Sequence, residues 1–411
     1  MRAIFPLFSI LILVSCQSPQ NGPKVTLQDD VYYLASDALE GRESGTKGEK
    51  MATAYLAERF AAIGLEQKGD SGYFQTFNFK QGSNPHQTNQ IVDSVTSATG
   101  QGINVIGYLD RNADKTVVIG AHLDHLGYGG EGSLFRDTIP SIHNGADDNA
   151  SGVALMLYLA QALKDEPTSQ TNYLFIGFAG EEKGLLGSNY FAKNPTIDLA
   201  EVNFMINMDM VGRLNQEETV AVHGVGTSPI FKQVLFANND QGLTIAEHES
   251  GVGPSDHTSF YLVDLPVLHF FTGQHEDYHK PSDDAEKINY AGMEKIGTYI
   301  LAVINDLDDD PKLTFRKTKN ESEETPRFKV GLGVVPDYLF TGSGMRIDGV
   351  SQDKPAQKAG LQKGDVVVRL GDSTVTDMMS YMRALSSFSG GDKTQAVIER
   401  DDQTLKVQIE F

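Results

Sequence analysis

Short, nearly uninterrupted apolar runs alternate with helical patterns along much of this chain, and they constrain its fold most strongly. Residues 116–121 read Thr-Val-Val-Ile-Gly-Ala, and similar runs predict strands over 173–179 and 203–208. Between them, the spacing of apolar residues predicts helices over 152–164 and 184–193. Continuous hydrophobicity is typical of parallel strands that are buried on both faces. The chain is therefore predicted to be an α/β protein with a central mixed, mostly parallel sheet and helices on both faces.

The flanking segments extend this α/β domain, which we place at 27–305. Helical patterns fill most of 27–64, and Gly64 suits the end of a helix. Further strands are predicted over 73–79, 103–109 and 262–271, and a long helix over 290–307.

Composition limits the partners and the kinds of metal site. The chain has 411 residues with 34 Lys and Arg against 55 Asp and Glu, so its net charge is −21. This charge, with no local Lys/Arg cluster, argues against nucleic acid as a partner because phosphates would be repelled. The one cysteine, Cys16, cannot form an internal disulfide and excludes zinc sites built from several thiolates. Any metal must be held by His, Asp and Glu.

The first sixteen residues have the features of an export signal. An apolar run at 3–14 has about 12 residues, shorter than the roughly 20 that span a bilayer. Its end, Leu13-Val14-Ser15-Cys16, resembles a bacterial lipobox, which implies a diacylated Cys16 at the mature N-terminus. We predict a lipoprotein signal peptide over 1–15, a polar tether over 16–26, and export to the bacterial cell envelope (periplasmic or outer membrane) with a lipid anchor. The alternative is an ordinary secretion signal with an incidental cysteine.

A composition shift marks a second unit. Residues 306–327 are dense in charge and are predicted to form a solvated linker. Residues 328–411 have strands and a short helix of their own and the size of a small independent domain.

Two motifs in the C-terminal unit resemble a PDZ domain of the bacterial protease-associated kind. They are Gly331-Leu332-Gly333-Val334 and Pro-Ala-Gln-Lys-Ala-Gly-Leu-Gln-Lys-Gly-Asp-Val-Val at 355–367. The resemblance implies a small β-rich domain in which Gly331, Leu332, Gly333 and Val334 hold the C-terminal carboxylate of a peptide that is added as an extra strand. The alternative is a domain that only packs on the α/β domain.

Polar residues that suit metal binding follow the predicted strands. They fall at the carboxyl ends of the strands, where open α/β sheets bind ligands. Imidazoles together with carboxylates are typical ligands of Zn²⁺. Asp124 lies two residues after His122, so in an extended chain both side chains point the same way and the carboxylate can hold the second N–H of the imidazole. The set comprises His122, Asp124, Asp147, Asp148, Glu181, Glu182, Asp209 and His279.

Each of these residues alone has an ordinary explanation. Asp148 suits a helix N-cap, a Glu-Glu pair is usually solvated, and a histidine after a strand is more often a hydrogen-bonded loop residue than a ligand. The position and order of the whole set indicate a functional site.

Five motifs surround these residues. They are Gly-Ala-His-Leu-Asp-His at 120–125, Asn-Gly-Ala-Asp-Asp-Asn-Ala-Ser-Gly at 144–152, Phe-Ala-Gly-Glu-Glu-Lys-Gly-Leu-Leu-Gly-Ser at 178–188, Asn-Met-Asp-Met-Val-Gly at 207–212 and Tyr-His-Lys-Pro-Ser-Asp at 278–283. Together they resemble the secreted co-catalytic zinc aminopeptidases of the bacterial leucyl aminopeptidase and glutamate carboxypeptidase group, over roughly 27–305.

The resemblance implies two Zn²⁺ ions. Asp148 would bridge them, His122 and Asp209 would complete one site, and Glu182 and His279 the other. Supporting roles next to the ligands are implied for Asp124, and for Asp256 and His257 in the further family segment Ser255-Asp256-His257. No aromatic residue stands just before that segment, where some relatives place a substrate-binding tyrosine.

The activity implied is that of a metallopeptidase that removes N-terminal residues from peptide substrates. A zinc-activated water would attack the scissile carbonyl, with Glu181 as the general base. Two alternatives stay open: a single-zinc glutaminyl cyclase, which is an acyltransferase of the same fold, and a non-catalytic peptide-binding lipoprotein. The presence of all five ligand positions and Glu181 favours the peptidase.

Overall fold

The computed structural model describes residues 25–411, apart from 83–88, 94, 131, 136, 138, 167–169, 320–329, 338, 341, 352–353 and 402. The predicted signal peptide and Cys16 lie outside the described residues. Within the described part of the chain, no helix has both the length and the apolar character needed to cross a bilayer.

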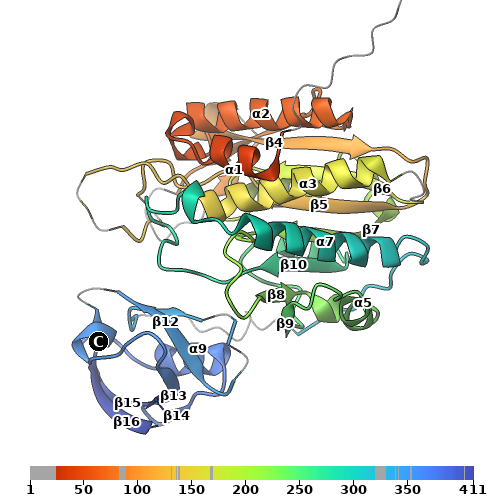
Figure 1. The fold of residues 1–411 in the computed structure, drawn as a ribbon. Coiled ribbons are helices and arrows are strands. Elements are labelled where there is room, and N and C mark those ends of the chain that lie inside the picture. The colour runs from red at the N-terminus through yellow and green to blue at the C-terminus, as the bar shows by residue number, and fades with distance from the viewer. Residues whose placement is uncertain are drawn as a thin grey trace, which may run out of the picture.

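A ten-stranded sheet forms the centre of the larger domain (Figure 1). In spatial order its strands are β3 (Gln90–Ile91), β2 (Phe74–Lys80), β4 (Gly100–Leu109), β6 (Asn172–Phe178), β5 (Thr116–His122), β7 (Val202–Met208), β10 (Val267–Phe271), β8 (Thr219–His223) and β9 (Thr244–His248), and β1 (Glu66–Gln67) pairs with β4. The central strands β6, β5, β7 and β10 are parallel. Strands β4 and β8 join them antiparallel. The predicted mixed sheet is confirmed, with its parallel strands mainly at the centre.

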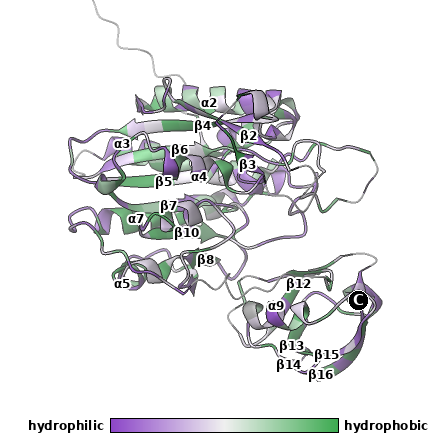
Figure 2. Ribbon diagram, turned by 180° about the vertical axis from the view of Figure 1, so that it is seen from behind, coloured by the Kyte–Doolittle hydropathy of each residue, from purple (hydrophilic) through white to green (hydrophobic). Residues whose placement is uncertain are grey.

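Helices cover both faces of this sheet, as the front view and the view from behind show (Figures 1 and 2). Buried side chains of one core come from α1 (Leu27–Leu34), α2 (Lys47–Ile63), α3 (Gly152–Asp165), α5 (Phe231–Ala237) and α7 (Tyr290–Asp306). A second core, on the other face, takes side chains from α4 (Leu186–Lys193) and α6 (His257–Tyr261). Gly64 ends α2 in the left-handed conformation, with φ 84°, which a glycine adopts without strain.

The predicted strand over 262–271 is shorter than expected. It begins at Val267, because the chain before it leaves α6 through a turn in which Asp264 has φ 62°. A left-handed residue cannot continue an extended strand. The apolar residues of that turn were therefore wrongly assigned to the strand.

The C-terminal domain is a separate β-rich unit with its own core. Its sheet has the order β11-β12-β13-β15-β16, with β14 paired to β13. The elements are β11 (Val334–Pro336), β12 (Met345–Val350), α8 (Pro355–Lys358), β13 (Val366–Leu370), β14 (Ser373–Thr374), α9 (Met378–Ser386), β15 (Lys393–Arg400) and β16 (Gln403–Glu410).

The described part of 306–327 is mostly exposed, but it is bonded to the larger domain. The Leu313 backbone N–H donates to Asn203 Oδ1 at 2.7 Å, and the Thr318 N–H donates to the Tyr261 hydroxyl at 3.0 Å. Leu313 and Phe315 pack against the two cores of the larger domain. Lys312 and Arg316 flank these two apolar anchors in the sequence. The stretch is therefore held on the larger domain.

Candidate metal centre

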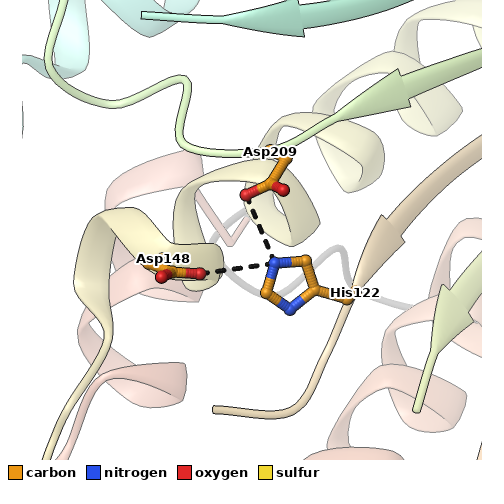
Figure 3. A group of neighbouring side chains, drawn as sticks. All are labelled: His122, Asp148 and Asp209. Atoms are coloured by element: carbon orange, nitrogen blue, oxygen red, sulfur yellow. Dashed lines mark hydrogen bonds and ion pairs between the residues drawn. The ribbon is translucent and has the colours of Figure 1, made fainter. Parts of the chain in front are cut away.

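Three side chains meet at the carboxyl ends of β5 and β7. His122 is the last residue of β5, Asp209 follows β7, and Asp148 lies in the turn before α3. His122 Nε2 is 3.3 Å from Asp148 Oδ1 and 3.2 Å from Asp209 Oδ1 (Figure 3). The three form a group that suits one divalent cation.

A second group shares Asp148. His279 Nε2 is 3.2 Å from Asp148 Oδ2 and 3.3 Å from Glu182 Oε2. Asp148 therefore turns one carboxylate oxygen toward His122 and the other toward His279. The structure brings all five predicted ligand residues into one cluster, while their roles as ligands stay predictions.

His125 belongs to the same cluster, and the sequence reasoning missed it. His125 Nδ1 is 2.8 Å from Glu182 Oε1 and 3.9 Å from Asp148 Oδ2. Its ring lies edge-on to that of His279, with centroids 5.9 Å apart, and its buried Nε2 has no hydrogen-bond partner among the described residues. His125, Asp148 and Glu182 form a further group that suits a cation. The motif His-Leu-Asp-His was the available signal. His125 follows the end of the strand, however, so its spacing from His122 does not predict where its side chain points.

The imidazoles and carboxylates of the cluster neutralise one another. Burial alone would lower the pKa of His279, but its hydrogen bonds to Asp148 and Glu182 outweigh burial and raise that pKa to about 11. Burial and the Asp148 charge would raise the pKa of Glu182, yet hydrogen bonds from His125 and His279 bring it to about 2. A divalent cation fits this donor set because it can replace the protons, since it binds neutral imidazole and ionised carboxylate.

Glu181 lies beside the cluster. Its side chain lines the same cavity as Asp148, Glu182 and His279. Burial raises the pKa of the Glu181 carboxyl well above its usual range, His122 opposes this, and the Asp209 charge adds to it. A carboxyl group with a raised pKa that faces candidate metal ligands suits proton transfer.

Asp124 does not make the predicted hydrogen bond through its carboxylate. His122 Nδ1 lies 3.2 Å from the backbone carbonyl oxygen of Asp124 and 3.9 Å from its carboxylate. The carboxylate instead accepts the backbone N–H of Glu181 at 3.1 Å. The carbonyl therefore orients the imidazole, and the side chain holds the loop that carries Glu181.

Asp256 and His257 are both fully buried. Burial raises the pKa of Asp256 to about 7, although the charge of His122 opposes the rise. The His257 ring stacks on that of His269 with centroids 4.5 Å apart, and His269 lines the cavity. Both positions are compatible with supporting roles.

Two further residues, which the sequence did not reveal, fix the turn that carries Asp148. The buried Arg42 guanidinium donates to the carbonyl oxygens of Asn144 and Gly145 at 2.7 and 3.0 Å. Asp283 Oδ2 accepts the backbone N–H of Asp147 at 2.9 Å and that of Asp148 at 3.1 Å. These contacts hold a candidate bridging carboxylate in place from distant parts of the chain.

A cavity of about 320 Å³ opens on the cluster. This volume is in the range of small-molecule sites and can accept an amino-acid side chain. Tyr278 stacks on His279 with ring centroids 3.8 Å apart and supplies an aromatic wall. Besides the candidate ligands and Glu181, the lining includes Met210, His223, Pro254, His269, Phe271 and Tyr278.

The motif at 331–334 lies where β11 begins. The buried Leu332 accepts the Ala356 backbone N–H at 2.8 Å through its carbonyl oxygen. Gly333 has φ 78°, and a Cβ there would lie 2.1 Å from Lys354 Cβ, so this position requires glycine. Binding of a carboxylate by Gly331, Leu332, Gly333 and Val334 stays a prediction.

Comparison with known proteins agrees with the two-domain reading. Residues 104–304 match the model of Peptidase family M28, and residues 313–411 match that of a PDZ domain. Aminopeptidase YwaD of Bacillus subtilis is 30% identical over 180 residues, which are 41% of this chain and 38% of that protein. The chain spans about half the length, or less, of the first curated relatives that it matches.

Two solved structures share the fold. BSAP, a zinc aminopeptidase from Bacillus subtilis, has a TM-score of 0.54 at 17% identity over 73% of this chain and 98% of that one. The glutaminyl cyclase of Bacteroides thetaiotaomicron has a TM-score of 0.53 at 18% identity over 69% of this chain and 99% of that one. At these identities the likeness shows the fold alone, so it does not separate a peptidase from a cyclase.

Proposed function

We propose that the protein is a zinc-dependent exopeptidase that removes N-terminal residues from peptides, because residues 104–304 match the model of Peptidase family M28. The observation that carries the proposal is Asp148, whose two carboxylate oxygens face His122 and His279 at 3.3 and 3.2 Å. This arrangement suits a bridge between two cations. We assign one Zn²⁺ to His122, Asp148 and Asp209, and a second to Asp148, Glu182 and His279.

Glu181 acts as the general base. Zinc, when bound, would lower the pKa of a coordinated water and polarise the substrate carbonyl. Glu181 accepts a proton from the attacking water and donates it to the amine as the scissile C–N bond breaks. The first residue of the substrate occupies the cavity beside Met210 and Tyr278.

Glu181→Gln tests this assignment. The amide cannot accept a proton, so we expect zinc content and fold to stay and kcat on aminoacyl p-nitroanilides to fall by about 10²-fold or more. Glu43→Gln is the matched control, because Glu43 pairs with Lys183 at 2.8 Å beside the same loop and lies outside the cavity lining. Near-native turnover by zinc-loaded Glu181→Gln would remove Glu181 from the mechanism.

The alternatives predict different products. A single-zinc glutaminyl cyclase would bind one zinc ion and release ammonia from peptides with N-terminal glutamine. A non-catalytic peptide-binding lipoprotein would turn over neither substrate. Zinc stoichiometry measured beside p-nitroaniline and ammonia release separates the three.

We further propose roles for the two ends of the chain. The C-terminal domain, which matches the PDZ model, takes the C-terminal carboxylate of a peptide on the loop Gly331–Val334, because backbone N–H groups in such loops bind anions. Cys16 carries the lipid that anchors the exported protein in the cell envelope, since two acyl chains give stable membrane binding.

A further inference from the structure

A second cavity, of about 440 Å³, lies between the two domains. Figures 1 and 2 show β12 on the side of the C-terminal domain that faces the larger domain. The larger domain lines the cavity with the loop 272–276 and with Arg213, Asn215 and Glu217. The C-terminal domain contributes Asp337, Leu339, Arg346, Asp348 and Lys363.

The interdomain cavity adjoins the cavity at the metal cluster. Gln274 lines both of them. The two domains approach each other at the preceding residue, where a Cβ on Gly273 would lie 2.9 Å from Leu339 Cδ1. Gly273 also has φ 97°, a conformation that favours glycine. A peptide that leaves the metal site past Gln274 therefore enters the space between the domains.

The direction of β11 determines which way a peptide bound through its C-terminus would run. Strand β11 stands at one end of the strand order of the C-terminal sheet, as far as the described residues show, so it has an edge on which a peptide can add. If the peptide carboxylate lies on Gly331–Val334, at the start of β11, the rest of the peptide must run toward Pro336. The next wall residues in that direction are Asp337 and Leu339, which line the interdomain cavity.

The charges of the cavity wall are largely paired with one another. Arg346 Nε is 2.7 Å from Asp337 Oδ2, and Lys363 Nζ is 2.8 Å from Asp348 Oδ1. Such a wall offers donors and acceptors to a peptide backbone without strong selection for one sign of charge. The occupant that fits is an extended peptide of mixed sequence.

The anchored linker limits how far the domains can separate. Thr318 is held by Tyr261 at 3.0 Å. From Thr318 to Val330 the chain has 330 − 318 = 12 steps, which reach roughly 40 Å at most when fully extended. The loop Gly331–Val334 therefore stays within roughly 40 Å of Thr318.

We propose that the two cavities and the edge of β11 form one continuous track that holds a peptide from its N-terminus at the metal cluster to its free C-terminus at Gly331–Val334. This inference rests on the proposed function and narrows its substrate class to peptides with a free carboxyl terminus that are long enough to span the track. Binding at the second end becomes intramolecular, which raises affinity without new contacts at the metal cluster.

The test compares peptides with the same N-terminal residues in the full-length, zinc-loaded protein. A peptide of about 12 residues, which spans roughly 40 Å, is used as free acid and as C-terminal amide. We expect the free acid to have a KM at least about tenfold below that of the amide. Tripeptides and aminoacyl p-nitroanilides should show no such gain.

Two variants narrow the interdomain cavity from opposite sides. Asp348→Trp fills the cavity from β12, and Glu217→Trp fills it from the larger domain. If one variant fails to fold, the other still tests the proposal. Lys393→Trp is the matched control, because Lys393 lies on β15 with a side chain that is 71% exposed and pairs with Glu410 outside the cavity. Both cavity variants should remove the advantage of the free acid and leave p-nitroanilide hydrolysis unchanged, whereas the control should keep both.

Equal KM values for free acid and amide in the native chain would overturn the track, as would cavity variants that keep the difference. Failure to hydrolyse p-nitroanilides would count against the proposed function instead. Fluorescence anisotropy with Glu181→Gln protein and an internally labelled peptide then tests the track without turnover. The track requires tighter binding of the free acid than of the amide, and loss of that difference in the cavity variants.

Discussion

Replacing His125 by alanine should weaken zinc binding at the site of Asp148, Glu182 and His279. His125 Nδ1 lies 2.8 Å from Glu182 Oε1, so the imidazole can donate to a charged carboxylate and hold its other oxygen toward His279. A hydrogen bond to a charged group contributes about 1.5–3 kcal/mol. Since about 1.4 kcal/mol corresponds to tenfold in affinity, the loss should be roughly 10- to 100-fold, the usual effect of removing a residue that orients a metal ligand.

Competition with a chelator, followed by stepwise calorimetric titration, measures the two zinc affinities separately. His143→Ala is the matched control: the His143 ring nitrogens lie 2.8 Å from Ser133 Oγ and 2.9 Å from the Ser141 carbonyl oxygen, so this imidazole belongs to the same loop but is bonded away from the ligands. Only His125→Ala should weaken one site. Native zinc affinities in folded His125→Ala, or an equal loss in His143→Ala, would refute the positioning role.

Three further outcomes follow from the cluster and from the N-terminal motif. Asp148→Asn should lower occupancy of both zinc sites together, because an amide is a poor bridge between cations; loss of a single ion, measured by metal analysis, would make Asp148 a terminal ligand. Zinc binding near pH 7 should release protons and weaken as pH falls, because the metal-free His279, with a pKa of about 11, must give up its proton; calorimetry in buffers of different ionisation enthalpy measures the release, and zero release contradicts the assignment. Cys16→Ser should move the protein from the membrane fraction to the soluble envelope fraction with unchanged p-nitroanilide hydrolysis, and membrane retention after correct signal removal would reject the lipid anchor.

The centre of the fold was predictable because burial on both faces leaves a direct mark on the sequence. Strand β5 is buried along its whole length, and the run at 116–121 shows it. The linker shows where this logic fails. Leu313 and Phe315 lie in a short stretch flanked by Lys312 and Arg316. Only the tertiary structure reveals that the larger domain offers a site for each apolar side chain.

The sequence predicts those parts of the candidate site whose residues stand at the ends of neighbouring strands. His122 and Asp209 meet because β5 and β7 are adjacent and parallel, which the alternation of strands and helices already favours. The contacts of Arg42 and Asp283 were not predictable, because these residues are 103 and 135 positions from their partners in the turn of Asp148. Asp283 ends the motif at 278–283, but the motif does not tell which backbone groups its carboxylate accepts. The contact of His125 with Glu182 likewise depends on the path of two loops.

The composition of the cluster explains why so many distant groups are needed to hold it. Its carboxylates outnumber its imidazoles: Asp124, Asp148, Glu181, Glu182 and Asp209 stand against His122, His125 and His279. A buried excess of negative charge is costly unless cations or hydrogen bonds compensate it. The guanidinium of Arg42 donates to carbonyl oxygens rather than to these carboxylates, so it fixes the turn without discharging them. This excess of negative charge favours the protonated forms of Glu181 and His279, whose pKa values are both raised. Two divalent cations would remove the same excess more completely, and on this reasoning the proposed metal ions belong to the stability of the site as well as to its chemistry.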